Sequence, residues 1–530
     1  MPSYREDESE VLQNGKSKPD ICSGIGLPPS SRLSVAASKE QDKPLGERKK
    51  AVLRQTLMVI FANSGVIGSG LAVAMPAVTL KQFQDENEQI YLNPSEASWY
   101  ASINTMACPL GGMLVGYLLD KIGRKRTMLV NNVIGIIGWA LIAGAFQKDK
   151  DSAFIQILIG RFISGIMIGL FCSPTGVYAA EITLPKIRGK LLLGTAVGLS
   201  LGILSMYILG YFIRDSWRLI STICLCYQIL CFLLVTPMPE SPSWLMQKGR
   251  SEESRKSLKF FRGIDKNDNT TYEEFEAEFS QIKKTSQIAA DDGKQSLLTS
   301  IKEPEVYKPL LIMLGMFFFQ QFSGVVVVVV YAVQIAVTAG VKMDPLLCAI
   351  FVGLGRILTT CCLGYILETW GRRPAGMVSG SGMATCMLLI AASSWFPVIL
   401  DHAPFLPAVC IVLQFMFSTM GLLTLPFYMI SEVYPQKVRG VASGMTVCIG
   451  LIMSFLVLKI YPSMVDVMGN ENVFAFYGLV SLLAVFYIYF ILPETKGKSL
   501  LEIEEYFKTG KFPNRNQPIE NEMQEVFIKK

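Results

Sequence analysis

The chain has 530 residues, of which 51% are hydrophobic and only 17% are charged, and its mean hydropathy is +0.39. Soluble domains carry about 25% charged residues, and a single soluble core stops growing near ~250–300 residues. The composition therefore excludes one soluble globular enzyme, a disordered chain and a disulfide-stapled secreted domain. A net charge of +6 offers no basic face to nucleic acid. The composition indicates a lipid bilayer as the solvent.

Long apolar stretches follow one another along the chain. About 18–20 apolar residues cross a ~30 Å hydrocarbon core as a helix. Two candidate spans, Ser152–Ala180 and Pro345–Leu367, contain one arginine each, Arg161 and Arg356. The uncharged stretches are Gln55–Leu80, Ala97–Leu119, Thr127–Gln147, Leu191–Ile213, Leu219–Pro239, Pro309–Val341, Pro374–Leu400, Ala403–Ser431, Gly440–Leu458 and Asn472–Pro493. We therefore predict an all-α membrane protein with twelve transmembrane helices and both termini on one side.

The charges of the loops predict on which side of the membrane the two termini lie. With both ends inside, the short inner loops carry eleven lysines and arginines and the outer loops carry six. Inner loops are the more basic in membrane proteins, so we expect both termini to be cytoplasmic. Residues 1–50, rich in Ser, Pro, Gly, Lys and Glu, are expected to form a disordered cytoplasmic tail.

Three charged loop motifs occur twice, in the same order. GYLLDKIGRKR is matched by GYILETWGRR, EITLPKIRG by EVYPQKVRG, and PESPSWL by PETKG. The acidic residues of the three pairs, which lie 248, 251 and 254 positions apart, are Asp120 and Glu368, Glu181 and Glu432, and Glu240 and Glu494. Such a repeat is typical of transporters that bind solute between two halves. It predicts two six-helix bundles, 51–238 and 309–493, joined by a cytoplasmic helical linker, 239–308, and followed by a cytoplasmic tail, 494–530.

The motifs place carboxylates and arginines together at the inner helix ends. We expect ion pairs within each motif, which join Glu181 to Arg188, Glu432 to Arg439, and Asp120 to Arg124. The same gating set includes Glu240, Glu368, Arg372 and Glu494. Half-solvated ion pairs are worth only ~0–1 kcal/mol each, which suits a latch that opens in every cycle. The alternative is that the arginines simply mark basic inner loops, but this does not explain the recurring glutamates.

The motifs D-K-x-G-R-K-R, E-x(6)-R-G, PESP, QQFSG and PETKG resemble those of the sugar porter family of the major facilitator superfamily. The resemblance covers roughly residues 50–508. It is strongest to insect facilitated trehalose transporters and related animal hexose facilitators, to which Ser98-Trp99 and Lys459 are also similar. It implies alternating access by two rocking bundles, inner salt bridges that stabilise the outward-facing state, short cytoplasmic helices in the linker, and a place in the plasma membrane. We expect a monomer.

The resemblance also implies a set of residues that contact the solute. Gln320, Gln321 and Tyr331 match sugar-contacting positions of the family, and Phe427 takes the place of a tryptophan. Other family amides fall on residues that cannot replace them, namely Ala196, Val326, Arg356 and Ile449. Losing three of these amides would weaken sugar binding by about 2–4 kcal/mol, because each hydrogen bond is worth ~0.5–1.5 kcal/mol. Glutamines in membrane helices also act as interhelical glue, and that alternative stays open for Gln320 and Gln321.

Arg356 is the most informative interior residue. It is expected near the middle of the membrane, where an arginine costs at least ~2.5–3.5 kcal/mol and usually faces a cavity. It either faces the solute path and favours an anionic or strongly accepting solute, or bonds helix backbone or a polar neighbour, or the helix limits are misplaced. Arg161 is expected to organise helix packing rather than to contact solute.

These features favour a facilitative transporter of a sugar such as trehalose or a hexose. The first span contains no carboxylate that could couple transport to protons, and no Walker A loop is present. No nucleophile–base pair or metal-ligand cluster stands out, so we expect no enzyme, no cofactor and no metal. The expected partners are a small solute and the lipid bilayer. Two alternatives remain, a transporter of a non-sugar polar or anionic solute and a transport-dead relative that senses its ligand.

Overall fold

The computed structural model describes residues 49–84, 90–146, 149–171, 173–264, 272–291, 303–435, 438–510 and 512. Within these ranges the chain forms helices and no strand. Twelve of the helical stretches are long and apolar enough to cross a membrane, which confirms the predicted all-α membrane fold. The predicted N-terminal tail lies almost entirely outside the described residues, whereas residues 494–510 and 512 of the predicted C-terminal tail are described and include a helix, Leu500–Thr509.

The first six spans come from the N-terminal part of the chain. They are α2 (Lys49–Phe83), α3 (Pro94–Ile122), α4 (Arg124–Ala143), α5 (Lys150–Phe171) with α6 (Pro174–Ile182), α7 (Pro185–Phe212) and α8 (Trp217–Val235). Most extend several residues beyond the uncharged stretches, because their charged ends continue the helix. Within this half α3 packs against α5, and α2 packs against α7.

The last six spans form a second bundle. They are α13 (Pro304–Phe322) with α14 (Val325–Val330) and α15 (Ala332–Thr338), α16 (Pro345–Trp370), α17 (Arg372–Trp395), α19 (Leu406–Met420) with α20 (Leu425–Val433), α21 (Arg439–Met468) and α22 (Asn470–Phe490). A short helix, α18 (Pro397–His402), follows α17. Within this half α17 packs against both α19 and α22.

Three of the spans predicted as continuous helices are interrupted, between α5 and α6, between α13, α14 and α15, and between α19 and α20. Two of these breaks lie at glycines. Gly324 has a φ of +80° between α13 and α14, a left-handed conformation that glycine adopts without strain. The break between α19 and α20 lies at Gly421, where an added Cβ would come 2.7 Å from the carbonyl oxygen of Ala375 on α17. These two breaks therefore occur at glycines, one because of its backbone conformation and the other because of its close helix contact.

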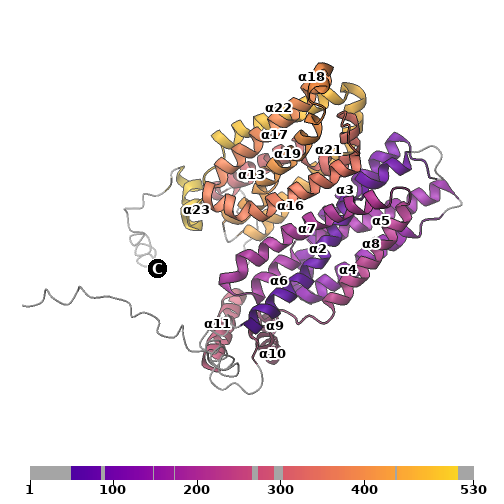
Figure 1. The fold of residues 1–530 in the computed structure, drawn as a ribbon. Coiled ribbons are helices and arrows are strands. Elements are labelled where there is room, and N and C mark those ends of the chain that lie inside the picture. Colours follow the sequence, from indigo (N-terminus) through magenta and orange to yellow (C-terminus); the bar gives the residue numbers. More distant parts are fainter. Residues whose placement is uncertain are drawn as a thin grey trace, which may run out of the picture.

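The two bundles lie side by side (Figure 1), with α3 packed against α21, and α7 against α16. Four shorter helices lie at one end of the molecule, which we call the inner end in keeping with the predicted orientation. They are α9 (Pro242–Gln247), α10 (Ser251–Arg262), α11 (Tyr272–Asp291) and α23 (Leu500–Thr509). Three of them, α9, α10 and α11, come from the predicted linker, and α10 packs on α9 and α2. The opposite end, which carries α18, is the outer end.

Candidate functional site

At the inner end of the first bundle, Arg124 is the centre of a buried ionic network. Its Nε and Nη2 donate to both carboxylate oxygens of Glu181, at 2.7–3.2 Å, and its Nη1 donates to the carbonyl oxygen of Leu119 at 3.1 Å. The Glu240 carboxylate accepts from the backbone N–H groups of Arg124 and Lys125 at 2.9 and 3.0 Å. A carboxylate at this position stabilises the start of α4, where backbone N–H groups have no helical partner.

The second bundle repeats this network with the matching residues. Arg372 donates to both oxygens of Glu432, at 2.5 and 3.2 Å, and to the carbonyl oxygen of Leu367 at 3.3 Å. Glu494 accepts from the backbone N–H groups of Arg372 and Arg373 at 3.0 and 2.9 Å, at the start of α17. The two networks correspond residue by residue, and each lies inside one bundle.

The predicted pairing within each motif is wrong. Arg188 donates to the carbonyl oxygen of Thr183 at 3.2 Å, and Arg439 donates to that of Tyr434 at 3.0 and 3.1 Å. Each arginine thus binds a carbonyl at the end of the preceding helix instead of the motif's glutamate. That glutamate is bound by an arginine 57 or 60 positions away, Arg124 or Arg372, which the packing of the bundle brings to it.

The two acidic residues of the first motif, Asp120 and Glu368, are exposed. Neither forms an ion pair with any residue that the structure describes. The expected pair between Asp120 and Arg124 is therefore also wrong, because the Arg124 guanidinium turns toward Glu181 instead. The backbone carbonyl of Asp120 accepts from the indole N–H of Trp244 on α9 at 3.1 Å.

The predicted solute-contacting glutamines lie buried at the end of α13. Gln320 Nε2 donates to the carbonyl oxygen of Leu423, in the break between α19 and α20, at 2.5 Å. Gln321 Nε2 donates to Gln320 Oε1 at 3.1 Å, while Gln321 Oε1 is buried with no partner among the described residues. Gln320 therefore supports the helix break, and Gln321 keeps one free acceptor.

Phe427, the residue at the family's tryptophan position, lies on α20. Its side chain is 48% exposed and meets the ring of Phe317 edge to face, with ring centroids 5.3 Å apart. A large part of one aromatic surface is thus left uncovered next to a buried ring.

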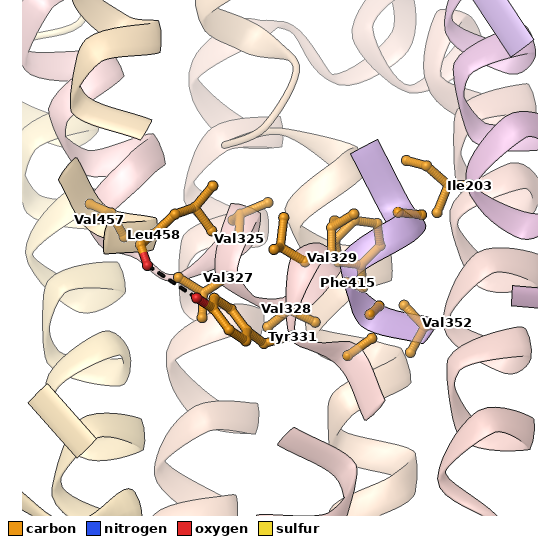
Figure 2. Close-up of a cluster of buried hydrophobic side chains, with 14 of the residues drawn as sticks. Ile203, Val325, Val327, Val328, Val329, Tyr331, Val352, Phe415, Val457 and Leu458 are labelled. Carbon is orange, nitrogen blue, oxygen red and sulfur yellow. Dashed lines mark hydrogen bonds between the residues drawn. The ribbon is translucent and has the colours of Figure 1, made fainter. Parts of the chain in front are cut away.

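Tyr331 follows six consecutive valines, Val325–Val330, which we call the valine block (Figure 2). The block packs with Ile203 of the first bundle and with Phe415 and Leu458 of the second. The Tyr331 hydroxyl donates to the carbonyl oxygen of Leu458 at 3.4 Å, and the hydroxyl of Tyr207 donates to that of Val329 at 2.9 Å. The block therefore forms an apolar contact between the two bundles.

Arg356 lies on α16 at the contact with α7. Its Nε donates to Ser200 Oγ of the first bundle at 2.9 Å, and its guanidinium carbon lies 5.4 Å from the centre of the Phe415 ring. By contrast, Arg161 is 1% exposed and donates to two backbone carbonyls, of Ala72 at 2.6 Å and of Tyr100 at 3.4 Å. The predicted packing role of Arg161 agrees with these contacts, whereas Arg356 bonds across the interface between the bundles.

Polar contacts that join the bundles lie toward the outer end. Lys459 Nζ on α21 donates to Ser98 Oγ on α3 at 2.6 Å and lies 4.1 Å from the centre of the Trp99 ring, a cation–π contact. Deeper along the same helices, Cys448 Sγ lies 3.8 Å from the carbonyl oxygen of Pro109. The sequence showed Lys459 only as a shared motif residue, and its contact with Ser98 and Trp99 depends on packing between the bundles.

A second outer contact is an ion pair between Arg214, after α7, and Asp344, before α16. The hydrogen bond to Asp344 raises the pKa of the Arg214 guanidinium. Burial on its own raises the pKa of the Asp344 carboxyl, but hydrogen bonds from Arg214 and from the backbone N–H of Leu346 outweigh it and hold that pKa below its usual value. No sequence motif marked this pair, because the partners are 130 positions apart.

A cavity of about 430 Å³ lies near these contacts, between the bundles. Its lining includes Lys81, Ser98, Tyr331, Tyr461, Asp466 and Asn470. Tyr331 thus lies at the outer side of the valine block, apart from the glutamine pair of α13 with which the sequence grouped it.

Comparison with known proteins assigns the chain to a family. Residues 51–507 match the family described as "Sugar (and other) transporter". The chain belongs to this sugar transporter family. The match covers every span, both inner networks and the linker helices α9, α10 and α11. The residues described above are therefore those of a sugar transporter family member.

Relatives in the sugar transporter family include two insect proteins named facilitated trehalose transporter Tret1. The protein of Polypedilum vanderplanki is 30% identical over 458 residues, which are 86% of this chain and 88% of the relative. That of Drosophila mojavensis is 30% identical over 459 residues, which are 85% of this chain. The chain spans only about half, 51%, of the length of the Drosophila relative.

Among solved structures, the chain resembles the xylose transporter XylE from E. coli. The inward-open conformation matches with a TM-score of 0.70 at 23% identity and covers 84% of this chain and 98% of that one. The complex with 6-bromo-6-deoxy-D-glucose, described as a major facilitator superfamily protein, matches with a TM-score of 0.67 at 22% identity and covers 86% of this chain and 99% of that one. These matches show that this sugar transporter family member has the major facilitator fold.

Proposed function

We propose that the chain carries a sugar across a membrane by alternating access, without coupling to an ion gradient. The observation that carries the proposal is the family match over residues 51–507, which includes two bundles with corresponding ionic networks. Curated relatives named for facilitated trehalose transport support a sugar as the solute and facilitated diffusion as the mode. The matching networks support the predicted internal repeat, which places a solute site between the halves.

The contacts between the bundles suggest how the site opens. Ser98, Lys459, Arg214 and Asp344 tie the outer ends together, whereas the networks of Arg124 and Arg372 each hold helices of one bundle. We infer that this is an inward-facing state. When the bundles rock, the outer contacts break and the inner ends approach, and the unpaired carboxylates of Asp120 and Glu368 then become available to the arginines of the other half. These carboxylates and Arg188 and Arg439 stay proposed gating residues.

The solute site is proposed at the glutamine pair of α13 and at Phe427, Tyr331 and Arg356. The support is strongest for Gln321, whose Oε1 is buried without a partner among the described residues. A buried acceptor without a donor costs about 1–3 kcal/mol, and a sugar hydroxyl that donates to it removes this cost. The exposed ring of Phe427 provides an apolar surface for the face of a sugar ring.

The positions of the acidic residues support uncoupled transport. No carboxylate occurs in α2, and the acidic residues of the other described spans lie near the helix ends, as Glu96, Glu181 and Asp466 do. A proton-coupled carrier needs a titratable group that both faces reach. We further propose that both termini are cytoplasmic, that the protein resides in the plasma membrane, and that it acts as a monomer.

The test is uptake of labelled trehalose and D-glucose into proteoliposomes that contain the purified full-length chain, with and without a pH gradient. We expect the internal sugar concentration to reach the external one and to stop there under both conditions, while protein-free liposomes show no uptake. Accumulation that depends on the gradient would contradict uncoupled transport. Absence of flux for any solute would contradict transport and favour a sensing relative.

A further inference from the structure

Arg356 lies in the middle of a span and at the interface between the bundles. It is 11 residues after Pro345 and 14 before Trp370, which places it about 16 Å and 21 Å along the helix from the two ends. One helical turn toward the outer end is Val352, which packs with the valine block (Figure 2). Arg356 therefore lies immediately to the inner side of the apolar contact that separates it from the outer cavity.

Most of the hydrogen-bonding capacity of Arg356 is unused. Its Nε donates to Ser200 Oγ, but Nη1 and Nη2 donate to no residue in the part of the chain that the structure describes. The side chain is nevertheless nine-tenths buried, with 9% of its surface exposed. A guanidinium presents two terminal nitrogens in a planar fork that matches the two oxygens of a carboxylate.

Among the residues that the structure describes, no carboxylate compensates the charge of Arg356. The groups that face it are the hydroxyl groups of Ser200 and Tyr207 on α7, Thr360 on its own helix and the ring of Phe415 on α19. Hydroxyl and ring groups are neutral, and the acidic residues of the described spans lie toward the helix ends. A central cation without a counterion is costly in a membrane, and a bound anion lowers that cost.

Arg161 shows what a purely structural arginine looks like in the same protein. Its guanidinium is sealed in the first bundle, 1% exposed, and bonds two backbone carbonyls. The guanidinium of Arg356 donates to no backbone carbonyl of the described residues. It reaches a hydroxyl of the opposite bundle, which moves away from it if the bundles rock.

We propose that Arg356 makes the solute site selective for a sugar that carries a carboxylate, and that the carboxylate binds Nη1 and Nη2 of this residue. The inference rests on the proposed transport function and specifies its substrate class. The bound acid supplies the missing counterion, while its hydroxyl groups use the neutral polar groups nearby. Because Arg356 bonds Ser200 across the interface, binding of the acid links the two bundles at the point around which they move.

The test compares three labelled probes in proteoliposomes: D-glucuronate, which has both a ring with hydroxyl groups and a carboxylate; D-glucose, which lacks the charge; and lactate, which lacks the ring. For the wild type we expect uptake efficiency for glucuronate to exceed that for glucose and for lactate by tenfold or more. Arg356→Gln should lower glucuronate uptake about 10- to 100-fold, as expected for a charged hydrogen bond, and should lower glucose uptake far less, because glucose has no carboxylate to bind the guanidinium. Arg356→Lys should retain most glucuronate uptake.

A matched control is Arg250→Gln, which removes an exposed arginine just before α10 whose ion-pair partner among the described residues is Glu253. We expect it to leave the uptake of all three probes unchanged. The membrane potential gives an independent readout in the wild type. An inside-positive potential of about 60 mV should accumulate glucuronate about tenfold, because one charge is worth ~2.3 kcal/mol per 100 mV, and should not affect glucose.

The two proposals fail in different ways. Glucose uptake without glucuronate uptake, or an equal effect of Arg356→Gln on both probes, overturns the role of Arg356 and leaves sugar transport standing. Lactate uptake equal to that of glucuronate overturns the requirement for a sugar ring. If no probe crosses the membrane, the proposal of transport fails. The Arg356 proposal then requires that glucuronate raise the unfolding temperature of the detergent-solubilised wild type but not that of Arg356→Gln. Without that difference the Arg356 proposal fails as well.

Discussion

The inner and outer ends of this molecule are held together in different ways. At the inner end, ionic networks around Arg124 and Arg372 each stabilise one bundle. At the outer end, the contacts of Lys459 with Ser98 and of Arg214 with Asp344 connect the two bundles. Similar charged groups thus make two kinds of contact: one set joins helices within each half, and the other set joins the two halves to each other.

The comparison predicts the largest stability effects at the inner end. Arg124→Gln removes the cation that binds the partly buried Glu181, and Arg372→Gln does the same to Glu432, which keeps a hydrogen bond from Thr495. Each should destabilise the protein by up to about 3–5 kcal/mol, the cost of removing one partner of a fully buried pair. Thermal unfolding in detergent measures the loss.

The exposed pair of Arg250 with Glu253 is the control for these variants. Arg250→Gln should change stability by less than about 1 kcal/mol. Effects of equal size in the two bundles support the internal repeat. An unfolding temperature of Arg124→Gln equal to that of the wild type would contradict the structural role of the network.

The helix-capping glutamates should have smaller effects. Glu240→Gln and Glu494→Gln keep the shape of the side chain but remove the charge that accepts two backbone N–H groups at the start of α4 and of α17. We expect a loss of about 1–2 kcal/mol in each case. If only one of these two variants lowers the stability, the bundles are less alike than their contacts indicate.

Changes at the outer end should alter conformation more than stability. Lys459→Met removes the cation–π contact with Trp99 and the hydrogen bond to Ser98, a contribution of about 0.5–2 kcal/mol to the closed outer end. The outward-open population should rise about 2- to 30-fold. Distances between paired spin labels at the outer end, measured by double electron–electron resonance, should include a larger share of long distances. An unchanged distance distribution counts against a latch role for Lys459.

Breaking the ion pair of Arg214 with Asp344 should give the smallest change in the open population. The contribution of this pair depends on pH. Because the pKa of the Asp344 carboxyl is lowered, its stabilising contribution is present above the usual aspartate pKa near 4 and is lost only as pH falls through the lowered value. Distances at the outer end should therefore be constant between pH 5 and pH 7. Asp344→Asn should change the open population by only about twofold, because exposed ion pairs are weak. A transition near pH 6 would point to another group.

The sequence predicted the spans well, because the bilayer requires long uncharged stretches and loop charges mark their ends. It also identified most of the residues of the inner networks, among them Glu181, Glu432 and Arg372. It failed on their partners, since Arg188 and Glu181 are neighbours only along the chain, and bundle packing brings Arg124 to Glu181 instead. The breaks at Gly324 and Gly421 were missed because hydropathy does not detect a single left-handed residue or a close helix contact.

The interior was predicted in part. The position of Arg356 near the middle of a span and its polar neighbour were among the stated possibilities, but Ser200 and Tyr207 could not be named, because both lie on the other bundle. The same limit applies to Lys459 and to Arg214 with Asp344. Contacts between the halves leave no local pattern in the sequence, and they are the contacts that alternating access must break.

The most direct test of alternating access joins the two bundles covalently and measures flux. A Cβ placed at Gly112 on α3 lies 3.9 Å from Sγ of the native Cys448 on α21, so Gly112→Cys offers a disulfide between the bundles. In proteoliposomes we expect oxidation to abolish sugar uptake and a reductant to restore it, while Gly112→Ser and Gly112→Cys with Cys448→Ser stay active under both conditions. Full uptake with the crosslink demonstrated by mass spectrometry would contradict transport by relative movement of the two bundles.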